Sequence, residues 1–425
     1  MADINDLAAR QISDTSHDAD WVAFEAVIAT APDQIAIAPG ELVREWTDGQ
    51  RHFFQYRSRG KALNFLAVLS ARYRVLRDRW NDVGLAIYYH PGHEYNLAAM
   101  MKGMKQALEY CTTNFGAYQN KTVRIAEFPR YEMFAQSFLA SIPYSESIGF
   151  IARVDPANEE DIDYPFYVTA HEVAHQWWGH QVVGANVQGA TMIGESLAEY
   201  TAMMVMKHEF GPEKMRRFLK YDMDKYLSGR GAEKKKELPL VRVENQQYIH
   251  YQKGSVVFYA LQDYVGEDKV NRALRDYLKQ VAYQEPPYTT ALELEARLRQ
   301  VTPPEYSYLI DDMFDSITLY ENRALSATYR KLSNGKYEVK LKVAARKLKA
   351  DELGEEREAP LADWIDIGVF DDADKPLYMV RHKIEKNETE FTLVVDRVPK
   401  KAGIDPWNKL VDRAPDDNTI SVSKL

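Results

Sequence analysis

Two histidines and a glutamate within five consecutive residues place the strongest constraint on how this chain can fold. The segment HEVAH begins at His171 and ends at His175, with Glu172 between them. Side chains four positions apart lie on one face of an α-helix, where two imidazoles can bind a single metal ion. Asp163 can cap such a helix, and Pro165 suits its first turn. The spacing therefore predicts a metal-binding helix, with a chance occurrence of the pattern as the alternative.

Glu172 has a position that suits a general base. It lies one residue beyond His171, so its side chain points away from the ion but can reach a water molecule bound there. In zinc peptidases two neutral imidazoles hold the metal, and a carboxylate at this position accepts a proton from the acidified water. The pattern therefore indicates metal-assisted hydrolysis.

The third ligand decides the class of metal site. His180 follows His175 by five residues, and on a continued helix it would lie ~140° away, at ~100° per residue. We therefore interpret His180 as a structural residue. The segment GESLAEYTAMMVM instead supplies Glu195 and Glu199, four positions apart on a helix that is too apolar to be exposed. Because a carboxylate on a buried helix needs a partner, we expect Glu195 to be the third ligand and Glu199 to be the alternative.

The rest of the sequence changes from β-patterns to α-patterns and back. Asp48-Gly49 lies between two aromatic-rich segments and Asn334-Gly335 between two alternating ones, so each predicts a β-hairpin. Apolar and amphipathic segments between them predict helices over residues 93–116, 195–209, 212–227, 251–265, 267–281 and 290–300. At 425 residues the chain is long enough for several cores.

These patterns together predict an α+β multidomain protein. We expect four regions, which are a flexible tail over residues 1–18, a partial amino-terminal β domain over 19–92, a mainly helical catalytic domain over 93–317 and a carboxy-terminal β-sandwich over 318–425.

The composition limits which classes of partner the protein can bind and where it can be located. A formal net charge of -9 argues against nucleic acid as a partner, since phosphate binding requires a basic face. No apolar run approaches the ~18 residues of a membrane span, and no signal peptide opens the chain. We expect a soluble protein, with the cytoplasm and the periplasm as alternatives. Its single cysteine, Cys111, excludes an intrachain disulfide and is expected to be buried.

HEVAHQWWGH followed by GESLAEY resembles the aminopeptidase N family of zinc metallopeptidases, which are gluzincins with an HExxH motif. Nineteen residues separate His175 from Glu195, one more than is usual in the family. Matching ESLAEY to the family's EGFAEY makes Glu195 the metal ligand and puts the extra residue in the connecting loop. The resemblance implies a thermolysin-like catalytic domain with one Zn²⁺ per chain. It also implies an aminopeptidase that removes amino-terminal residues from short peptides by attack of a metal-activated water.

Two further motifs carry over from the family. The segment YQKG, which begins at Tyr251, resembles a Y-E-K-G-like motif whose tyrosine donates to the oxyanion of the tetrahedral intermediate. PYSESIGF stands where the family has a G-A-M-E-N-like strand, with Glu146 in the place of the glutamate that binds the substrate's free α-amine. Tyr144 and Gly149 belong to the same expected substrate-binding segment. The resemblance thus implies peptide substrates with a free amino terminus, and an ordinary loop glutamate is the alternative for Glu146.

Segments such as APDQIAIAPGELVREW most resemble a bacterial branch of the family, in which the peptidase follows a membrane segment of the ABC-transporter permease type. This implies a membrane-embedded permease segment, and hence membrane tethering, in the full-length protein. Two other functions stay open. One is a zinc endopeptidase, against which Glu146 argues. The other is a non-catalytic peptide-binding or sensor domain of a membrane transporter-like protein, against which Glu172 and Tyr251 argue.

Overall fold

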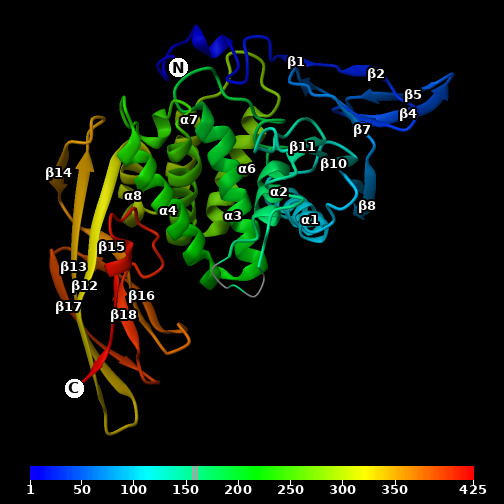
Figure 1. Ribbon diagram of the computed structural model, residues 1–425. Helices are drawn as coiled ribbons and strands as arrows, with labels where there is room; N and C mark the ends of the chain where they lie inside the picture. The colour runs from blue at the N-terminus through cyan, green and yellow to red at the C-terminus, as the bar shows by residue number, and fades with distance from the viewer. Residues whose placement is uncertain (156–157, 159–160) are drawn as a thin grey trace. The chain divides into compact units, whose positions relative to one another are not determined.

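The computed structural model describes residues 1–155, 158 and 161–425 (Figure 1). Strands come first, helices occupy the middle of the chain, and strands return towards the carboxyl terminus, which confirms the α+β multidomain prediction. The chain divides into two compact units. Unit 1 comprises Met1–Pro212, Val241–Asn245 and Gly266–Val301, and unit 2 comprises Glu213–Leu240, Gln246–Val265 and Thr302–Leu425. This division runs through the region expected as one catalytic domain.

The amino-terminal strands of unit 1 form small antiparallel sheets. They are β1 (Trp21–Val22), β2 (Glu25–Thr30), β3 (Ile35–Ile37), β4 (Glu41–Asp48), β5 (Arg51–Arg57), β6 (Ala62–Leu63) and β7 (Leu69–Ala71). Strands β2, β5 and β4 make one sheet, and β1–β6 and β3–β7 are pairs. The predicted hairpin at Asp48-Gly49 joins β4 to β5, and Gly49 has the positive φ (57°) that its turn requires.

A four-stranded sheet positions the catalytic region of unit 1. Its order is β11 (Ser141–Ser145), β10 (Thr122–Phe128), β9 (Val83–Tyr89), β8 (Arg74–Trp80). Strands β9, β10 and β11 are parallel, and β8 is antiparallel. Helix α1 (Leu97–Asn114), which includes the fully buried Cys111, connects β9 to β10, as parallel strands require (Figure 1).

The remaining helices of unit 1 are α2 (Tyr164–Ala174), α3 (Leu197–Phe210), α6 (Glu267–Val281) and α7 (Ala291–Val301), with a 3-10 turn η1 (Ala9–Gln11) and a π-helix η2 (Met192–Ser196). Gly103 lets α1 approach α2 closely, because a Cβ there would lie 2.9 Å from the carbonyl oxygen of Phe166. The predicted cap of α2 is confirmed, since Phe166 N–H donates to the Asp163 side chain at 3.2 Å and Pro165 lies in the first turn.

Residues 1–18, expected to be a flexible tail, run along the segment that follows α2 in unit 1. Ala2 forms a parallel bridge with Val187, and Ser13 forms an antiparallel bridge with Ala185. The Asp14 backbone N–H also donates to the Gly184 carbonyl at 3.0 Å. Backbone pairing thus holds a segment whose side chains carry no periodic apolar pattern.

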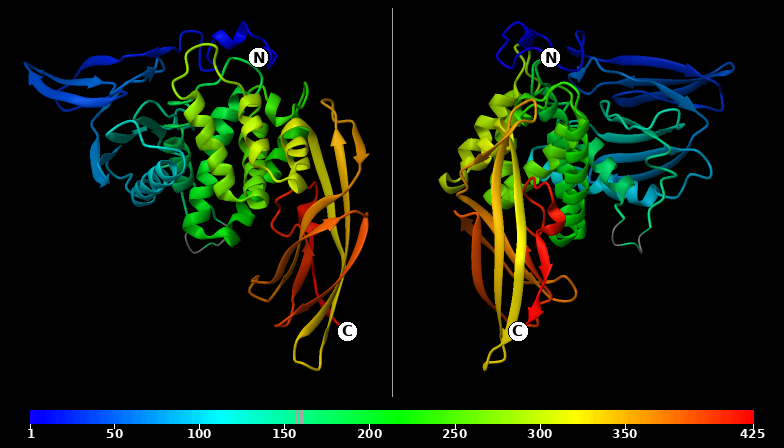
Figure 2. Two further views of the ribbon diagram at one scale, coloured as in Figure 1. Left: turned by 180° about the vertical axis from the view of Figure 1, so that it is seen from behind. Right: turned by 60° about the vertical axis from the view of Figure 1, so that its left-hand side comes forward.

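Unit 2 combines helices with two sheets (Figure 2). Its helices are α4 (Met215–Ala232), the π-helix η5 (Tyr248–Lys253), α5 (Gly254–Val265), α8 (Tyr308–Ile310) and the π-helix η7 (Asp311–Asp315). Its 3-10 turns are η6 (Pro304–Tyr306) and η8 (Pro415–Asp417), and two more, η3 (Pro212–Lys214) and η4 (Leu240–Arg242), lie where the chain passes between units.

The carboxy-terminal strands of unit 2 are β12 (Ile317–Lys331), β13 (Tyr337–Ala350), β14 (Glu356–Ala359), β15 (Asp363–Phe370), β16 (Pro376–Ile384), β17 (Glu388–Val395), β18 (Lys401–Ile404), β19 (Thr419–Ser421) and β20 (Ser423–Lys424). One sheet has the order β14-β13-β12-β20 with β17 also paired to β13, and the other has the order β16-β15-β18-β19. Strand β12 contacts β18 and β19 across the two sheets. The predicted hairpin at Asn334-Gly335 joins the two longest strands, β12 and β13 (Figure 2).

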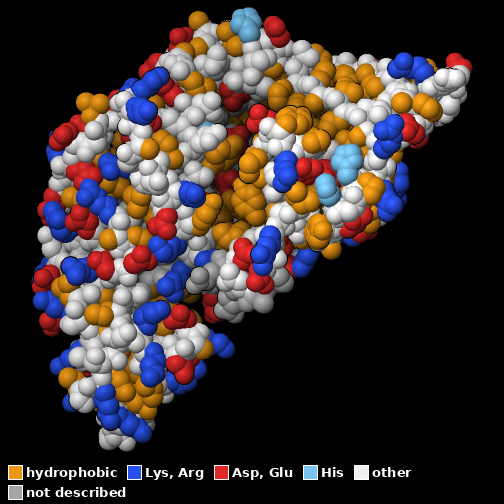
Figure 3. All heavy atoms as spheres, viewed as in Figure 1, with side chains coloured by type: hydrophobic (Ala, Val, Ile, Leu, Met, Phe, Trp, Pro, Cys, Tyr) orange, Lys and Arg blue, Asp and Glu red, His pale blue; other side chains and the backbone are white. Residues whose placement is uncertain are grey.

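The surface carries both signs of charge. On the face drawn in Figure 3, Lys and Arg side chains are interspersed with Asp and Glu side chains. In the part of the chain that the structure describes, no helix has both the length and the apolar character needed to cross a membrane.

Candidate active site

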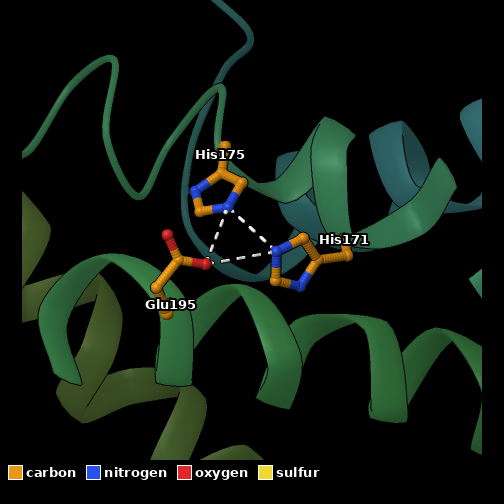
Figure 4. Close-up of side chains that lie close together, drawn as sticks. All are labelled: His171, His175 and Glu195. Atoms are coloured by element: carbon orange, nitrogen blue, oxygen red, sulfur yellow. Dashed lines mark hydrogen bonds and ion pairs between the residues drawn. The ribbon is translucent and has the colours of Figure 1, made fainter. Parts of the chain in front are cut away.

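His171, His175 and Glu195 converge on one point, as the sequence predicts (Figure 4). The Nε2 atoms of the two histidines are 3.0 Å apart, and Glu195 Oε2 lies 3.4 Å from each of them. Ligands bound at ~2.0–2.1 Å around a tetrahedral ion lie about 3.4 Å from one another. The three side chains therefore fit a site for one divalent metal ion.

Partners behind the two rings select the nitrogen that faces this point. His175 Nδ1 lies 2.8 Å from the backbone oxygen of Trp178, and His171 Nδ1 lies 3.2 Å from Glu199 Oε1. Such contacts to the far ring nitrogen orient a metal-binding histidine and leave Nε2 for the ion. The two glutamates weighed as third ligand thus have different positions, since Glu195 faces both rings and Glu199 lies behind His171.

A π-helical turn carries Glu195. The segment Met192–Ser196 is π-helical and leads directly into α3. A π-turn contains one residue more than an α-turn, which fits the gap between His175 and Glu195 that is one residue longer than the family pattern. Where the extra residue is accommodated, in this π-turn or in the connecting loop, stays a prediction.

His180 lies outside the ligand triangle. Helix α2 ends at Ala174 with His175 as its cap, and Gly179, with φ +138°, turns the chain away. His180 Nε2 lies 3.1 Å from the backbone oxygen of Ser137, and burial lowers the pKa of this imidazole to about 4. A neutral, buried ring in contact with a backbone carbonyl suits the structural role expected of it.

Glu172 is buried beside the triangle. Its Oε2 atom has no hydrogen-bond partner among the described residues. Burial raises the pKa of this carboxyl to about 7 against the opposing effect of His175, and the charge of Glu195 raises it further. Burial disfavours protonation of His175, but the carboxylates of Glu195 and Glu172 outweigh it and raise the pKa of His175 to about 9. Negative charge therefore accumulates where the ligands converge, and a metal cation would neutralise it.

A pocket of about 250 Å³ lies next to the triangle in unit 1. His175 and Glu195 line it, together with Gln136, Ser137 and, from the amino-terminal segment, Asp14. Burial raises the pKa of Asp14 to about 7, and the charge of Glu195 acts in the same direction. Asp14 does not stand out in the sequence, because a polar residue in a segment without apolar periodicity shows no sign of contact with a helix.

The residues of the expected substrate-binding segment, Tyr144, Glu146 and Gly149, lie at and after β11 in unit 1. Glu146 follows β11, and its Oε2 lies 3.9 Å from Nδ1 of His93. The Tyr144 ring is fully buried against Gly149. Among the described residues that line the pocket beside His175, none of these three is present. Burial raises the pKa of Tyr144, and this residue nevertheless lies close enough to Glu172 for the charge of that carboxyl to raise the pKa further. The substrate-binding role of the segment stays a prediction.

Tyr251 belongs to unit 2 and lies in the π-helix η5, directly before α5. Its ring packs edge-on against that of His250, with the centroids 4.4 Å apart. This agrees with the expectation that the YQKG motif opens a helix.

Comparison with known proteins finds peptidases. Residues 95–303 match the Peptidase family M1 domain. Endoplasmic reticulum aminopeptidase 2 of Homo sapiens is 28% identical over 218 residues, which are 48% of this chain and 22% of that protein. Among solved structures, Legionella pneumophila aminopeptidase A in complex with aspartic acid matches with a TM-score of 0.61 at 13% identity, over 96% of this chain and 46% of that one.

The chain spans less than half the length of both of these proteins. The structural match shows a shared fold. Residues 95–303 are thus similar to an M1 peptidase domain, and about half of the chain is similar to an aminopeptidase.

Proposed function

We propose that this chain is a zinc-dependent aminopeptidase that removes amino-terminal residues from short peptides. The observation that carries the proposal is the triangle of His171, His175 and Glu195, whose atoms are spaced for one ion inside a region that matches a peptidase domain. Two imidazole nitrogens and one carboxylate oxygen are a donor set that suits zinc. We expect one Zn²⁺ to be held there in each chain.

The residues around the triangle have separate chemical roles. The chemistry that zinc supplies when bound is Lewis acidity, which polarises a carbonyl and acidifies water. Glu172 accepts the proton of the attacking water and delivers it to the leaving amine. Tyr251 donates to the oxyanion of the tetrahedral intermediate. A domain that only binds peptides has no use for either group, so these residues favour an enzyme over a sensor.

Recognition of a free amino terminus requires an anionic partner, and Asp14 is our candidate for it. Its carboxylate lines the pocket with His175 and Glu195. No Lys or Arg among the described residues forms an ion pair with Asp14, so a substrate ammonium group would be its counter-charge. Glu146, in the segment that resembles the family's amine-binding strand, is the alternative.

Hydrolysis of chromogenic aminoacyl amides and of their N-acetylated counterparts, each with and without a zinc chelator, tests this function. We expect cleavage of the free-amine substrates only, and we expect the chelator to abolish it. Equal cleavage of both sets would indicate an endopeptidase. Cleavage of neither set by zinc-loaded protein would contradict an enzymatic function. Asp14→Asn should raise KM for free-amine substrates, and an equal rise in Glu146→Gln instead would reassign the amine to Glu146.

A further inference from the structure

A second group of metal-ligating side chains lies at one edge of the central sheet of unit 1. His93 follows β9, Glu127 is near the end of β10, and Glu146 follows β11. Because these three strands are parallel, their carboxyl ends meet at the same edge. One ligand atom from each residue lies within 4.8 Å of the others. We call these residues the sheet-edge cluster.

Each carboxylate of the sheet-edge cluster has one oxygen nearer a donor outside the cluster and one nearer His93. Glu127 Oε2 accepts the His90 backbone N–H at 2.6 Å, and its Oε1 contacts Nδ1 of His93. Glu146 Oε1 lies 3.7 Å from Nε of Arg130, and its Oε2 lies 3.9 Å from the same His93 nitrogen. In metal sites, such outer contacts orient the ligating oxygens towards the ion.

A turn at Gly92 places both His90 and His93. Gly92 has φ +93°, and the His93 backbone N–H donates to the His90 carbonyl at 3.1 Å. The turn therefore directs the His90 N–H at Glu127 and brings the His93 ring over the two carboxylates. The backbone of this turn thus helps to position the side chains of the sheet-edge cluster.

The charges in the sheet-edge cluster call for a cation. Glu127 is completely buried, and an ionised carboxylate in such a place needs a close counter-charge. The Arg130 side chain is 71% exposed and contacts only the outer oxygen of Glu146, so solvent screens its charge. Among the described residues, the imidazole of His93 is the only group that can offer positive charge to the two oxygens that face it, Glu127 Oε1 and Glu146 Oε2.

We propose that His93, Glu127 and Glu146 form a second divalent-cation site. One imidazole nitrogen and two carboxylate oxygens suit first-row divalent ions such as Zn²⁺ and Mn²⁺. His93 and Glu127 must separate to about 3 Å for both to ligate one ion, and the His93 side chain, which is 28% exposed, has room to turn. The ion would cross-link the turn before α1 to the ends of β10 and β11. The site does not rest on the aminopeptidase proposal, although Glu146, as a ligand here, would not then be available to bind the substrate amine.

The number of ions bound per chain tests this site without any measurement of activity. The full chain is saturated with Zn²⁺, freed of excess metal and analysed by elemental mass spectrometry. We expect two ions in the wild type, one in His171→Ala/His175→Ala and one in Glu127→Gln/Glu146→Gln. His52→Ala is the matched control, because His52 Nε2 lies 2.9 Å from Glu45 Oε1 without a second carboxylate, and it should still bind two.

A wild-type chain that binds one ion would overturn the proposal, and so would a Glu127→Gln/Glu146→Gln variant that keeps two. Thermal unfolding is a second test, in which the residues of the sheet-edge cluster are left unchanged. Added Zn²⁺ should raise the melting temperature of His171→Ala/His175→Ala, because a ligand that binds only the folded state stabilises it. An unchanged melting temperature at saturating Zn²⁺ would also overturn the proposal. Neither the ion count nor the melting temperature depends on activity, so both can be interpreted even if the aminopeptidase assays fail.

Discussion

Two three-residue clusters in unit 1 combine histidine and glutamate in opposite ways. The cluster at α2 has two histidines and one glutamate, and two of its ligands come from one helix turn. The sheet-edge cluster has one histidine and two glutamates, and its ligands come from three separated segments. In the first, contacts behind the rings orient the histidines; in the second, contacts behind the carboxylates orient the glutamates.

Their surroundings differ in a way that bears on function. The α2 cluster lies beside a pocket and next to Glu172, a buried carboxyl with an oxygen that no described residue satisfies. In the sheet-edge cluster, Glu127 instead has both oxygens in contact with donors. A site that performs chemistry needs room for substrate and a base without a structural partner. We therefore expect catalysis at the first cluster and a structural ion at the second.

Glu172→Gln should have the largest effect, because it should abolish turnover at the α2 cluster and leave metal binding at both clusters intact. Loss of a general base typically lowers kcat by about 10²–10⁴-fold, while neither the triangle nor the sheet-edge cluster loses a ligand. Steady-state kinetics and elemental analysis of the same sample would show lost turnover with unchanged metal content. Unchanged turnover would remove Glu172 from the mechanism and, with it, the contrast between a catalytic and a structural cluster.

The two clusters also differ in how far they can be predicted from the sequence. His171, His175 and Glu172 are predictable because one helix turn fixes their geometry, and Glu195 is predictable because it lies on an apolar helix. The π-turn that carries Glu195 could not be predicted, since it depends on how the helix packs. The match of Glu146 to a substrate-binding strand rests on the place of PYSESIGF in the chain, on the acidic residue itself and on Gly149. The neighbours of Glu146 depend on the order of parallel strands, which sequence spacing does not encode.

The fold shows the same limit. The turns at Asp48-Gly49 and Asn334-Gly335 were predictable, because both depend on local backbone preferences. Asp14 was missed because backbone hydrogen bonds, which leave no pattern in the side chains, hold its segment. The grouping of α4 and α5 with the carboxy-terminal strands depends on long-range packing and was not predicted.

Tyr251→Phe tests the oxyanion role proposed for Tyr251. Loss of one oxyanion donor should lower kcat by about 10²–10³-fold with little change in KM. Tyr248→Phe is a matched control from the same π-helix, because the Tyr248 hydroxyl donates to Glu233 at 3.1 Å, and kcat should stay unchanged. An effect of Tyr251→Phe on KM alone would remove the oxyanion role.

Glu199→Gln sharpens the distinction between a ligand and the partner behind it. Loss of a partner to a metal-binding histidine typically weakens metal affinity by about 10–100-fold, so Zn²⁺ at the α2 cluster should become easier to remove by a competing chelator. Glu195→Gln should have the larger effect. If Glu195→Gln binds Zn²⁺ as tightly as the wild type, Glu199 becomes the ligand and the triangle is misassigned. Affinity at the sheet-edge cluster should be the same in both variants.

Gly92→Ala should have the smallest effect and should act on the sheet-edge cluster alone. A Cβ at Gly92 meets no atom within 4 Å, so the only penalty is the positive φ of 93°. Such strain costs about 1–2 kcal/mol, and it should lower the free energy of unfolding by that amount. Because the turn positions both His90 and His93, the affinity of the sheet-edge cluster for Zn²⁺ should fall by up to about tenfold. Gly60→Ala, which has equal space and no positive φ, is the control. Equal affinity in Gly92→Ala and Gly60→Ala would show that the turn does not organise the cluster.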